Sequence, residues 1–115
     1  MKKSVRLSLI LIGLLIIISL ALVLIKKQPE QILFYSESCP HCKIVEEYIS
    51  QNNVKSYLNF KELEVSQNPA NAQLLAKEAT SCGLATDSIG VPFFFDGKNC
   101  LVGDENIIQY FSSKK

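Results

Sequence analysis

Residues 7–25 form an uninterrupted apolar run, which sets strong limits on the folds open to this chain. The run holds nineteen residues without a charge, and as a helix it spans about 28 Å, close to the thickness of a bilayer's hydrocarbon core. Cations lie on both sides of it, namely Lys2, Lys3, Arg6, Lys26 and Lys27. The sequence therefore predicts one transmembrane helix over 7–25, with a cytoplasmic tail, 1–6, a linker, 26–30, and a single small domain, 31–115.

A cleavable signal peptide is the rival interpretation of this run, because Ser19 and Ala21 are small residues at cleavage-like spacing. The apolar run continues to Ile25, however, which favours a retained signal anchor. More positive charge precedes the run than follows it, and this favours a cytoplasmic N-terminus. Four cysteines in a small domain suit an oxidising compartment. We therefore expect a single-pass membrane protein whose C-terminal domain lies outside the cytoplasm.

The predicted domain is acidic and is held near the bilayer. Of the twelve cations in the chain, five flank the apolar run, which leaves seven against eleven acids, a net of four negative charges. This balance argues against nucleic acid as a partner. The linker, stiffened by Pro29, reaches about 15 to 20 Å, so a membrane-embedded redox partner is within reach. A plain tether that only raises local concentration is the alternative.

Two cysteines, Cys39 and Cys42, lie where a predicted strand turns into a predicted helix. Residues 32–35 are apolar and β-prone, and they indicate a short buried strand. Pro40 suits the first position of the helix, where a missing N–H costs nothing, and this leaves Cys39 at the helix N-terminus. The expected inward face of this helix is formed by Ile44, Val45, Tyr48 and Ile49.

The start of a helix favours negative charge, because its first N–H groups are unpaired and its dipole is positive there. A thiolate at Cys39 is therefore stabilised, and a positive charge on His41 adds to the effect. The alternative for His41 is a solvated turn residue without a role. Cys42 lies on the same helical face as Cys39, so the two sulfurs can close into a disulfide and reopen by thiolate attack.

Half of a zinc site is another interpretation of the cysteine pair. Structural zinc needs four ligands, however, and Cys82 and Cys100 are distant in sequence while the single histidine lies inside the motif. A purely structural disulfide is also disfavoured, since so short a loop constrains the unfolded chain little. We therefore expect no metal and no cofactor apart from a redox-active disulfide between Cys39 and Cys42.

The next part of the domain is predicted to alternate between strand and helix. Residues 57–65 indicate a second strand with an irregular lead-in, parallel to the first because a helix connects them. Asn68 and Pro69 are typical of a helix start, and the helix runs to about Ser81, with Gly83 as its stop. Its expected buried residues are Leu74, Leu75, Ala79 and Cys82.

A hairpin and a final helix complete the predicted order. A strand over 93–95 follows Val91-Pro92, and Asp96-Gly97 predicts a turn into an antiparallel strand over 99–102. Asp104 is expected to cap the last helix, whose inward residues are Ile107, Ile108 and Phe111. The predicted fold class is α/β, with the order strand, helix, strand, helix, strand, strand, helix and a mixed sheet flanked by helices.

Residues 34–43, taken with 89–95, resemble the thioredoxin-like superfamily, and the resemblance covers residues 31–113. The short domain and the spelling Tyr-Ser-x-x-Cys-Pro-x-Cys are similar to glutaredoxin, while Pro-His between the cysteines is similar to the bacterial disulfide-forming oxidase DsbA. The resemblance implies a minimal thioredoxin-like fold. It also implies a cis Pro92 packed beside the cysteines, with the backbone of Val91 binding a substrate segment.

Two departures from these relatives bear on the substrate. Ser36 stands where glutaredoxins carry a basic residue, and 102–105 replaces their two-glycine, two-acid pattern. Glutathione, an anion, is therefore disfavoured, and protein dithiols are the expected substrates. Ser38 stands where thioredoxin carries tryptophan, which argues against thioredoxin reductase as a partner.

A second pair of cysteines, Cys82 and Cys100, falls in elements predicted to pack near the sheet. Outside the cytoplasm a structural disulfide between them is one expectation. Two buried free thiols are the second. A shuttle that exchanges electrons with Cys39 and Cys42 is the third.

These features predict a membrane-anchored thiol-disulfide oxidoreductase that acts on protein cysteines as an oxidase or isomerase. Cys39 attacks or is attacked, Cys42 resolves the mixed disulfide, and Pro40 and His41 tune the pair. Two rivals stay open. One is a reductase of the same fold, and the other is a non-enzymatic module that binds a soft metal through the two sulfurs.

Overall fold

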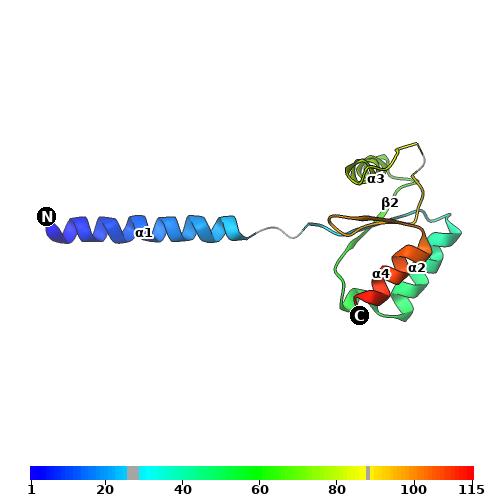
Figure 1. The fold of residues 1–115 in the computed structure, drawn as a ribbon, viewed down its shortest axis with the longest axis horizontal. Helices are drawn as coiled ribbons and strands as arrows, with labels where there is room; N and C mark the ends of the chain where they lie inside the picture. The colour runs from blue at the N-terminus through cyan, green and yellow to red at the C-terminus, as the bar shows by residue number, and fades with distance from the viewer. Residues whose placement is uncertain (26–28, 88) are drawn as a thin grey trace.

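The N-terminal segment is one long apolar helix. A computed structural model of the chain describes residues 1–25, 29–87 and 89–115. In it, α1 runs over Lys2–Leu24, so it begins earlier than the predicted span 7–25 (Figure 1). Its 23 residues make it long and apolar enough to cross a membrane, and none of its side chains is buried by the protein. The membrane helix therefore stays supported by length and composition, while most of the predicted linker, residues 26–28, lies outside the described residues.

The C-terminal part is a four-stranded mixed sheet with helices on both faces. The strands are β1 (Ile32–Tyr35), β2 (Lys61–Glu64), β3 (Phe93–Phe95) and β4 (Cys100–Val102). The helices are α2 (Pro40–Gln51), the 3-10 turn η1 (Val54–Ser56), α3 (Pro69–Ser81) and α4 (Asp104–Ser113). The strand order is β2-β1-β3-β4, with β2 parallel to β1 and the β1–β3 and β3–β4 pairs antiparallel. The predicted order of strands and helices is confirmed, with η1 added.

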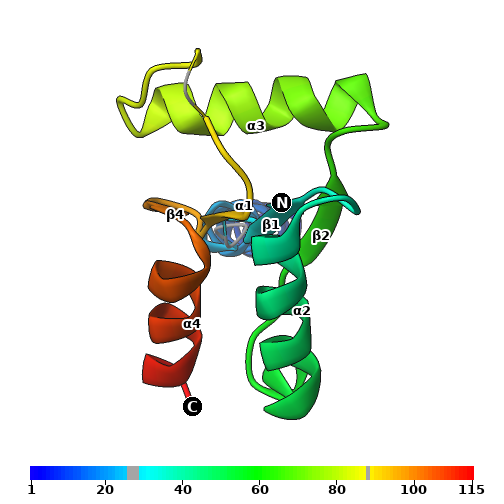
Figure 2. The same cartoon turned by 90° about the vertical axis from the view of Figure 1, so that its right-hand side faces the viewer.

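The core has two layers because both faces of the sheet are covered. Figure 2 shows α3 across one face and α2 beside α4 on the other. Alternate side chains of a strand point to opposite faces, so Leu33 packs against the α2 and α4 side while Phe34 packs against the α3 side. The fully buried members of the two layers include Val45, Phe94, Ile107 and Phe111 on one face and Phe93 and Ala79 on the other.

The ends of α3 follow from local sequence as predicted. The Asn68 side chain accepts hydrogen bonds from the N–H groups of Ala70 and Asn71, and Pro69 takes the first helical position. Gly83 follows the helix with φ of 75°, a left-handed conformation that suits glycine. Leu75 and Ala79 are buried, while the predicted Leu74 and Cys82 are half-buried.

The second strand is shorter than its apolar pattern. Only Lys61–Glu64 pairs with β1, and the preceding residues 57–60 form the irregular lead-in that was predicted. Phe60 and the half-buried Tyr57 and Leu58 still pack on the α2 and α4 side of the core. Their apolar character therefore reflects burial from a loop and not strand pairing.

Two expectations about the helices are wrong, one about a buried face and one about a helix cap. Ile44 is 45% exposed, because the buried stripe of α2 passes through Cys42, Val45 and Ile49 at helical spacing. Asp104 does not cap α4. Gly103, with φ of 90°, takes the cap position, and Asp104 is the first residue of the helix. Its carboxylate is directed instead toward His41 of α2.

Candidate functional site

Cys39 occupies the N-terminal cap of α2, as the sequence predicts. Its backbone is extended, with φ of −91° and ψ of 115°, and Pro40 is the first helical residue. The Cys39 sulfur accepts a hydrogen bond from the Cys42 N–H group, with 3.2 Å between nitrogen and sulfur. A sulfur in this position replaces the side-chain oxygen of an ordinary helix cap, and the unpaired N–H groups of the first turn favour negative charge there.

Cys42 lies one turn deeper and differs sharply in environment. It is 1% exposed, whereas Cys39 is partly accessible, and neither forms a disulfide in the structure. Burial and a hydrogen bond with the Cys39 side chain raise the pKa of Cys42 to about 12, against the lowering effect of the Ser36 backbone. Cys42 therefore stays a neutral thiol at physiological pH, and Cys39 is the sulfur that reagents can reach.

Alkylation of the reduced protein is expected to separate these two thiols. Iodoacetamide at pH 7 to 9 should modify Cys39 and spare Cys42, because at pH 7 a thiol with a pKa near 12 holds a thiolate fraction on the order of 10⁻⁵. Labelling of Cys42 should rise about tenfold per pH unit until the pH nears that pKa, because a raised pKa keeps the thiol protonated below it. Peptide mass mapping measures both sites.

The same labelling in guanidinium chloride supplies the control, since unfolding exposes both thiols and removes the difference in burial. Equal labelling of Cys39 and Cys42 in the native protein at pH 8 would contradict the buried environment of Cys42.

The residues before β3 bring a backbone carbonyl against the exposed sulfur. The Cys39 thiol donates a hydrogen bond to the Val91 carbonyl, with 3.5 Å between sulfur and oxygen. The Val91–Pro92 peptide bond is cis, as the resemblance implied, and Pro92 is buried. The Pro92 carbonyl in turn accepts a hydrogen bond from the Gly103 N–H group at 3.0 Å. Val91 and Pro92 thus lie at the predicted thiol pair although about fifty residues separate them in sequence.

His41 has a partner that sequence reasoning missed. Its Nδ1 atom lies 3.3 Å from Asp104 Oδ1, with 68% of the histidine side chain and 21% of the aspartate side chain exposed. The contact joins the first turn of α2 to the first residue of α4. No local signal marks this pair in the sequence, because it depends on the two helices starting side by side.

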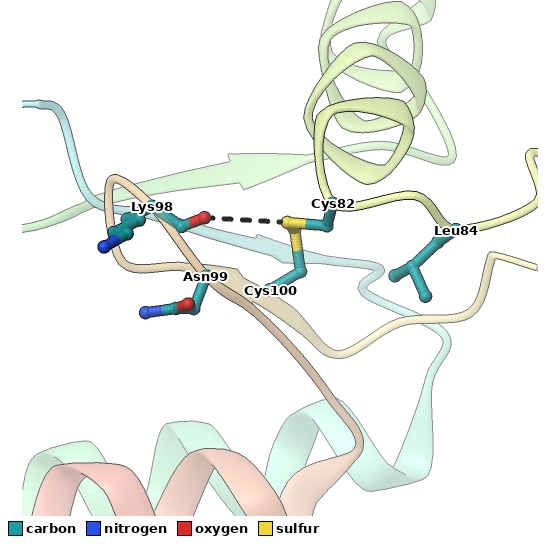
Figure 3. A pocket seen from close by; sticks show the side chains of 5 residues that line it. All are labelled: Cys82, Leu84, Lys98, Asn99 and Cys100. Atoms are coloured by element: carbon teal, nitrogen blue, oxygen red, sulfur yellow. Dashed lines mark hydrogen bonds between the residues drawn. A yellow bond between two sulfur atoms is a disulfide. The ribbon is translucent and has the colours of Figure 1, made fainter.

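Cys82 and Cys100 form a disulfide that joins the end of α3 to the start of β4. Figure 3 shows the bridge beside the β3–β4 turn, where an open pocket of about 360 Å³ is lined by Cys82, Leu84, Lys98, Asn99 and Cys100. The expectation of a structural disulfide is confirmed, and that of two free thiols is wrong.

The two cysteine pairs lie at opposite ends of the sheet. Cys100 pairs with Phe95, and Phe95 pairs with Ile32 at the start of β1. Cys39 follows the other end of β1, three residues after Ser36. The structure therefore does not bring the pairs together as an electron shuttle between them would require.

The described residues contain no group of three or more His, Cys, Asp or Glu side chains placed to hold a metal ion. The arrangement instead offers chemistry between two sulfurs. One sulfur is accessible and hydrogen-bonded at a helix N-terminus, and the other is close, buried and protonated. Such a pair suits the formation and reopening of a disulfide.

Mixed sheet, flanking helices and close cysteine pair are together compatible with a thioredoxin-like fold. Searches against protein-family models and against curated proteins find no match for this chain. The arrangement of the described residues is therefore the basis for any assignment of function.

Proposed function

We propose that residues 31–115 form a thioredoxin-like domain and that the chain is a membrane-anchored thiol-disulfide oxidoreductase acting on protein cysteines. The unequal pair of sulfurs is the observation that carries the proposal. Cys39 is partly accessible at the start of α2, whereas Cys42 is buried and its pKa is raised to about 12. Attack at Cys39 and resolution by Cys42 follow from this difference.

In the oxidising direction a substrate thiolate attacks the Cys39 sulfur of the Cys39–Cys42 disulfide. The bond between Cys39 and Cys42 breaks, and the Cys42 sulfur leaves with the electron pair and takes up a proton, which its high pKa favours. A second substrate thiolate then attacks the mixed disulfide and releases Cys39 as a thiolate. Two electrons have passed from the substrate dithiol to the protein, and a substrate disulfide has formed.

Val91 and Pro92 are proposed to bind the substrate segment during this exchange. The Val91 carbonyl lies against the Cys39 sulfur, so a peptide whose cysteine approaches Cys39 meets the Val91 backbone. Acidic side chains, Glu37, Asp104 and Glu105, lie near this end of the domain, which disfavours the anion glutathione relative to an extended protein segment.

A position outside the cytoplasm belongs to the same proposal. The Cys82–Cys100 disulfide supports it, because stable disulfides form in oxidising compartments. In such a compartment we favour the role of oxidase or isomerase, and a reductase of the same fold is the alternative.

The test is the reaction itself, measured with the full chain in detergent or vesicles. Oxidised protein mixed with a reduced, unfolded protein is expected to transfer its disulfide stoichiometrically, and the Cys39–Cys42 reduction potential should lie near the oxidising values of about −180 to −120 mV. A potential near about −270 mV would assign the reductase role instead. Exchange no faster than with the Cys39→Ser variant would refute the enzyme proposal.

A further inference from the structure

The chain enters the domain at a docked strap formed by residues 29–31. Pro29 packs against Gly97 so closely that a Cβ added at Gly97 would lie 2.8 Å from the Pro29 ring. Glu30 forms an ion pair with Lys61 at 2.5 Å, and the Gln31 carbonyl accepts a hydrogen bond from the Lys61 N–H group at 2.9 Å. The strap therefore fixes the entry point beside the β3–β4 turn. We call this end of the domain, with the starts of β1 and β2 and the turn 96–99, the base.

The base lies within a short reach of the membrane helix. Between Leu24, the last residue of α1, and Pro29 the chain takes five residue steps, which span at most about 18 Å when fully extended. Strand β1 runs away from the base, because Ile32 pairs with Lys61 there and Tyr35 pairs with Glu64 at the far end. Cys39 follows that far end.

Lysines gather at the base. Lys61 begins β2, Lys98 lies in the β3–β4 turn, and Lys114 and Lys115 follow the end of α4. Figure 1 shows the C-terminus on the side of the domain opposite the start of α2. Burial raises the pKa of Asp96, but hydrogen bonds from Asn99 and from the Lys98 N–H group lower it, and the positive charge of Lys114 adds to the lowering. Lys114 therefore lies near this turn.

Three acids lie at the base. Glu30 pairs with Lys61, Glu62 pairs with Lys55 at 2.7 Å, and the Asp96 carboxylate accepts hydrogen bonds from the Lys98 and Asn99 N–H groups. Among the described residues, no salt bridge engages Lys98, Lys114 or Lys115. In the sequence, Lys26 and Lys27 stand between α1 and the strap. The base is therefore left with an excess of positive charge.

The opposite end carries the reverse charge. Glu37 precedes the cysteine pair, Glu64 ends β2, and Asp104 and Glu105 begin α4. Lys43, in the first turn of α2, is a cation at this otherwise acidic end. The domain as a whole is acidic, yet its positive charge is concentrated where the chain leaves α1.

We propose that the base rests on the headgroups of anionic phospholipids through Lys98, Lys114 and Lys115. Anionic lipid attracts basic residues next to a membrane span, and it repels the acidic end of the domain. Cys39 is then turned toward water, so the protein segments it reaches lie away from the bilayer and not within a membrane-embedded partner. The inference rests on α1 spanning the bilayer, and it does not depend on the redox proposal.

The experiment places fluorophores at the two ends of the full chain in vesicles that carry a nitroxide on a fraction of the headgroups. Bimane on Cys39 reports the acidic end. Bimane on a cysteine introduced by Ser113→Cys, in a Cys39→Ser/Cys42→Ser background, reports the base. In vesicles with about 30% phosphatidylglycerol we expect quenching of the base label to exceed that of the Cys39 label by about twofold or more. In phosphatidylcholine vesicles the ratio should fall toward one.

The charge dependence is tested with Lys98→Gln/Lys114→Gln/Lys115→Gln, which should lose the excess quenching in anionic vesicles. Lys43→Gln/Lys77→Gln is the control, since it removes two cations outside the base and should keep the excess. Equal quenching of both labels in anionic vesicles, or equal effects of the two sets of substitutions, would overturn the proposal. If the chain failed to float with vesicles, both this proposal and the membrane span would be overturned. The redox proposal would be unaffected, because disulfide exchange is measured separately.

Discussion

Replacing Cys42 with serine is expected to trap the protein in mixed disulfides through Cys39. Cys39 is partly accessible and keeps its place at the start of α2, whereas the buried thiol that would release a bound partner is gone. Attack on a substrate disulfide then stops after its first step. Species that shift to lower mobility on non-reducing gels, and that disappear on reduction, measure the trapped fraction. Mass mapping should locate the linkage at Cys39.

Cys39→Ser is the matched control for the trap. The hydroxyl of serine is a poor nucleophile without an activating base, so this variant should form no mixed disulfide and should lose exchange by on the order of 10³-fold. Trapping through Cys42 in the Cys39→Ser variant would contradict the assigned roles. Absence of trapped species in Cys42→Ser, together with tight binding of one soft metal ion per wild-type chain, would favour the metal-binding module instead.

Phe94→Ala is expected to lower the free energy of unfolding of the domain by about 3 to 5 kcal/mol. The Phe94 side chain is fully buried, and its ring centroid lies 5.6 Å from that of Phe60, 5.4 Å from Tyr110 and 5.1 Å from Phe111. Truncation removes buried apolar area and leaves a cavity beneath α4. Urea unfolding of the full chain in detergent, followed by tyrosine fluorescence and circular dichroism, measures the loss.

Ile44→Ala provides the comparison, because Ile44 is 45% exposed although its sequence spacing predicted burial. A surface truncation of this kind should change the free energy of unfolding by no more than about 0.5 kcal/mol. A loss at Ile44 as large as that at Phe94 would mean that α2 is rotated relative to the arrangement described above.

Local features of this fold are legible in the sequence. Pro40 after Cys39 and Pro69 after Asn68 place two helix starts, because proline suits the first helical position and the preceding side chains can cap. The apolar runs 32–35 and 93–95 predict buried strands, because a strand covered on both faces needs apolar residues throughout. These signals act over a few residues.

The residues of the site could be predicted only in part. The Cys-x-x-Cys spacing identifies the cysteine pair, and the resemblance to thioredoxin-like proteins pointed to Pro92. No spacing rule places Asp104 against His41, and a helix cap was the sequence-based expectation for that aspartate. Whether Cys82 and Cys100 form a disulfide or stay free thiols was likewise open until α3 and β4 were placed.

The apolar helix, the order of strands and helices, and the position of Cys39 at the start of α2 could all be predicted from local sequence, because capping, periodicity and turn preferences are properties of neighbouring residues. Three features became known from the packed domain alone: the buried face of α2, the groups that lie against Cys39 and His41, and the position of the two cysteine pairs at opposite ends of the sheet. Those outcomes depend on how distant elements pack against one another, and packing free energy is shared among residues that no short window of sequence contains.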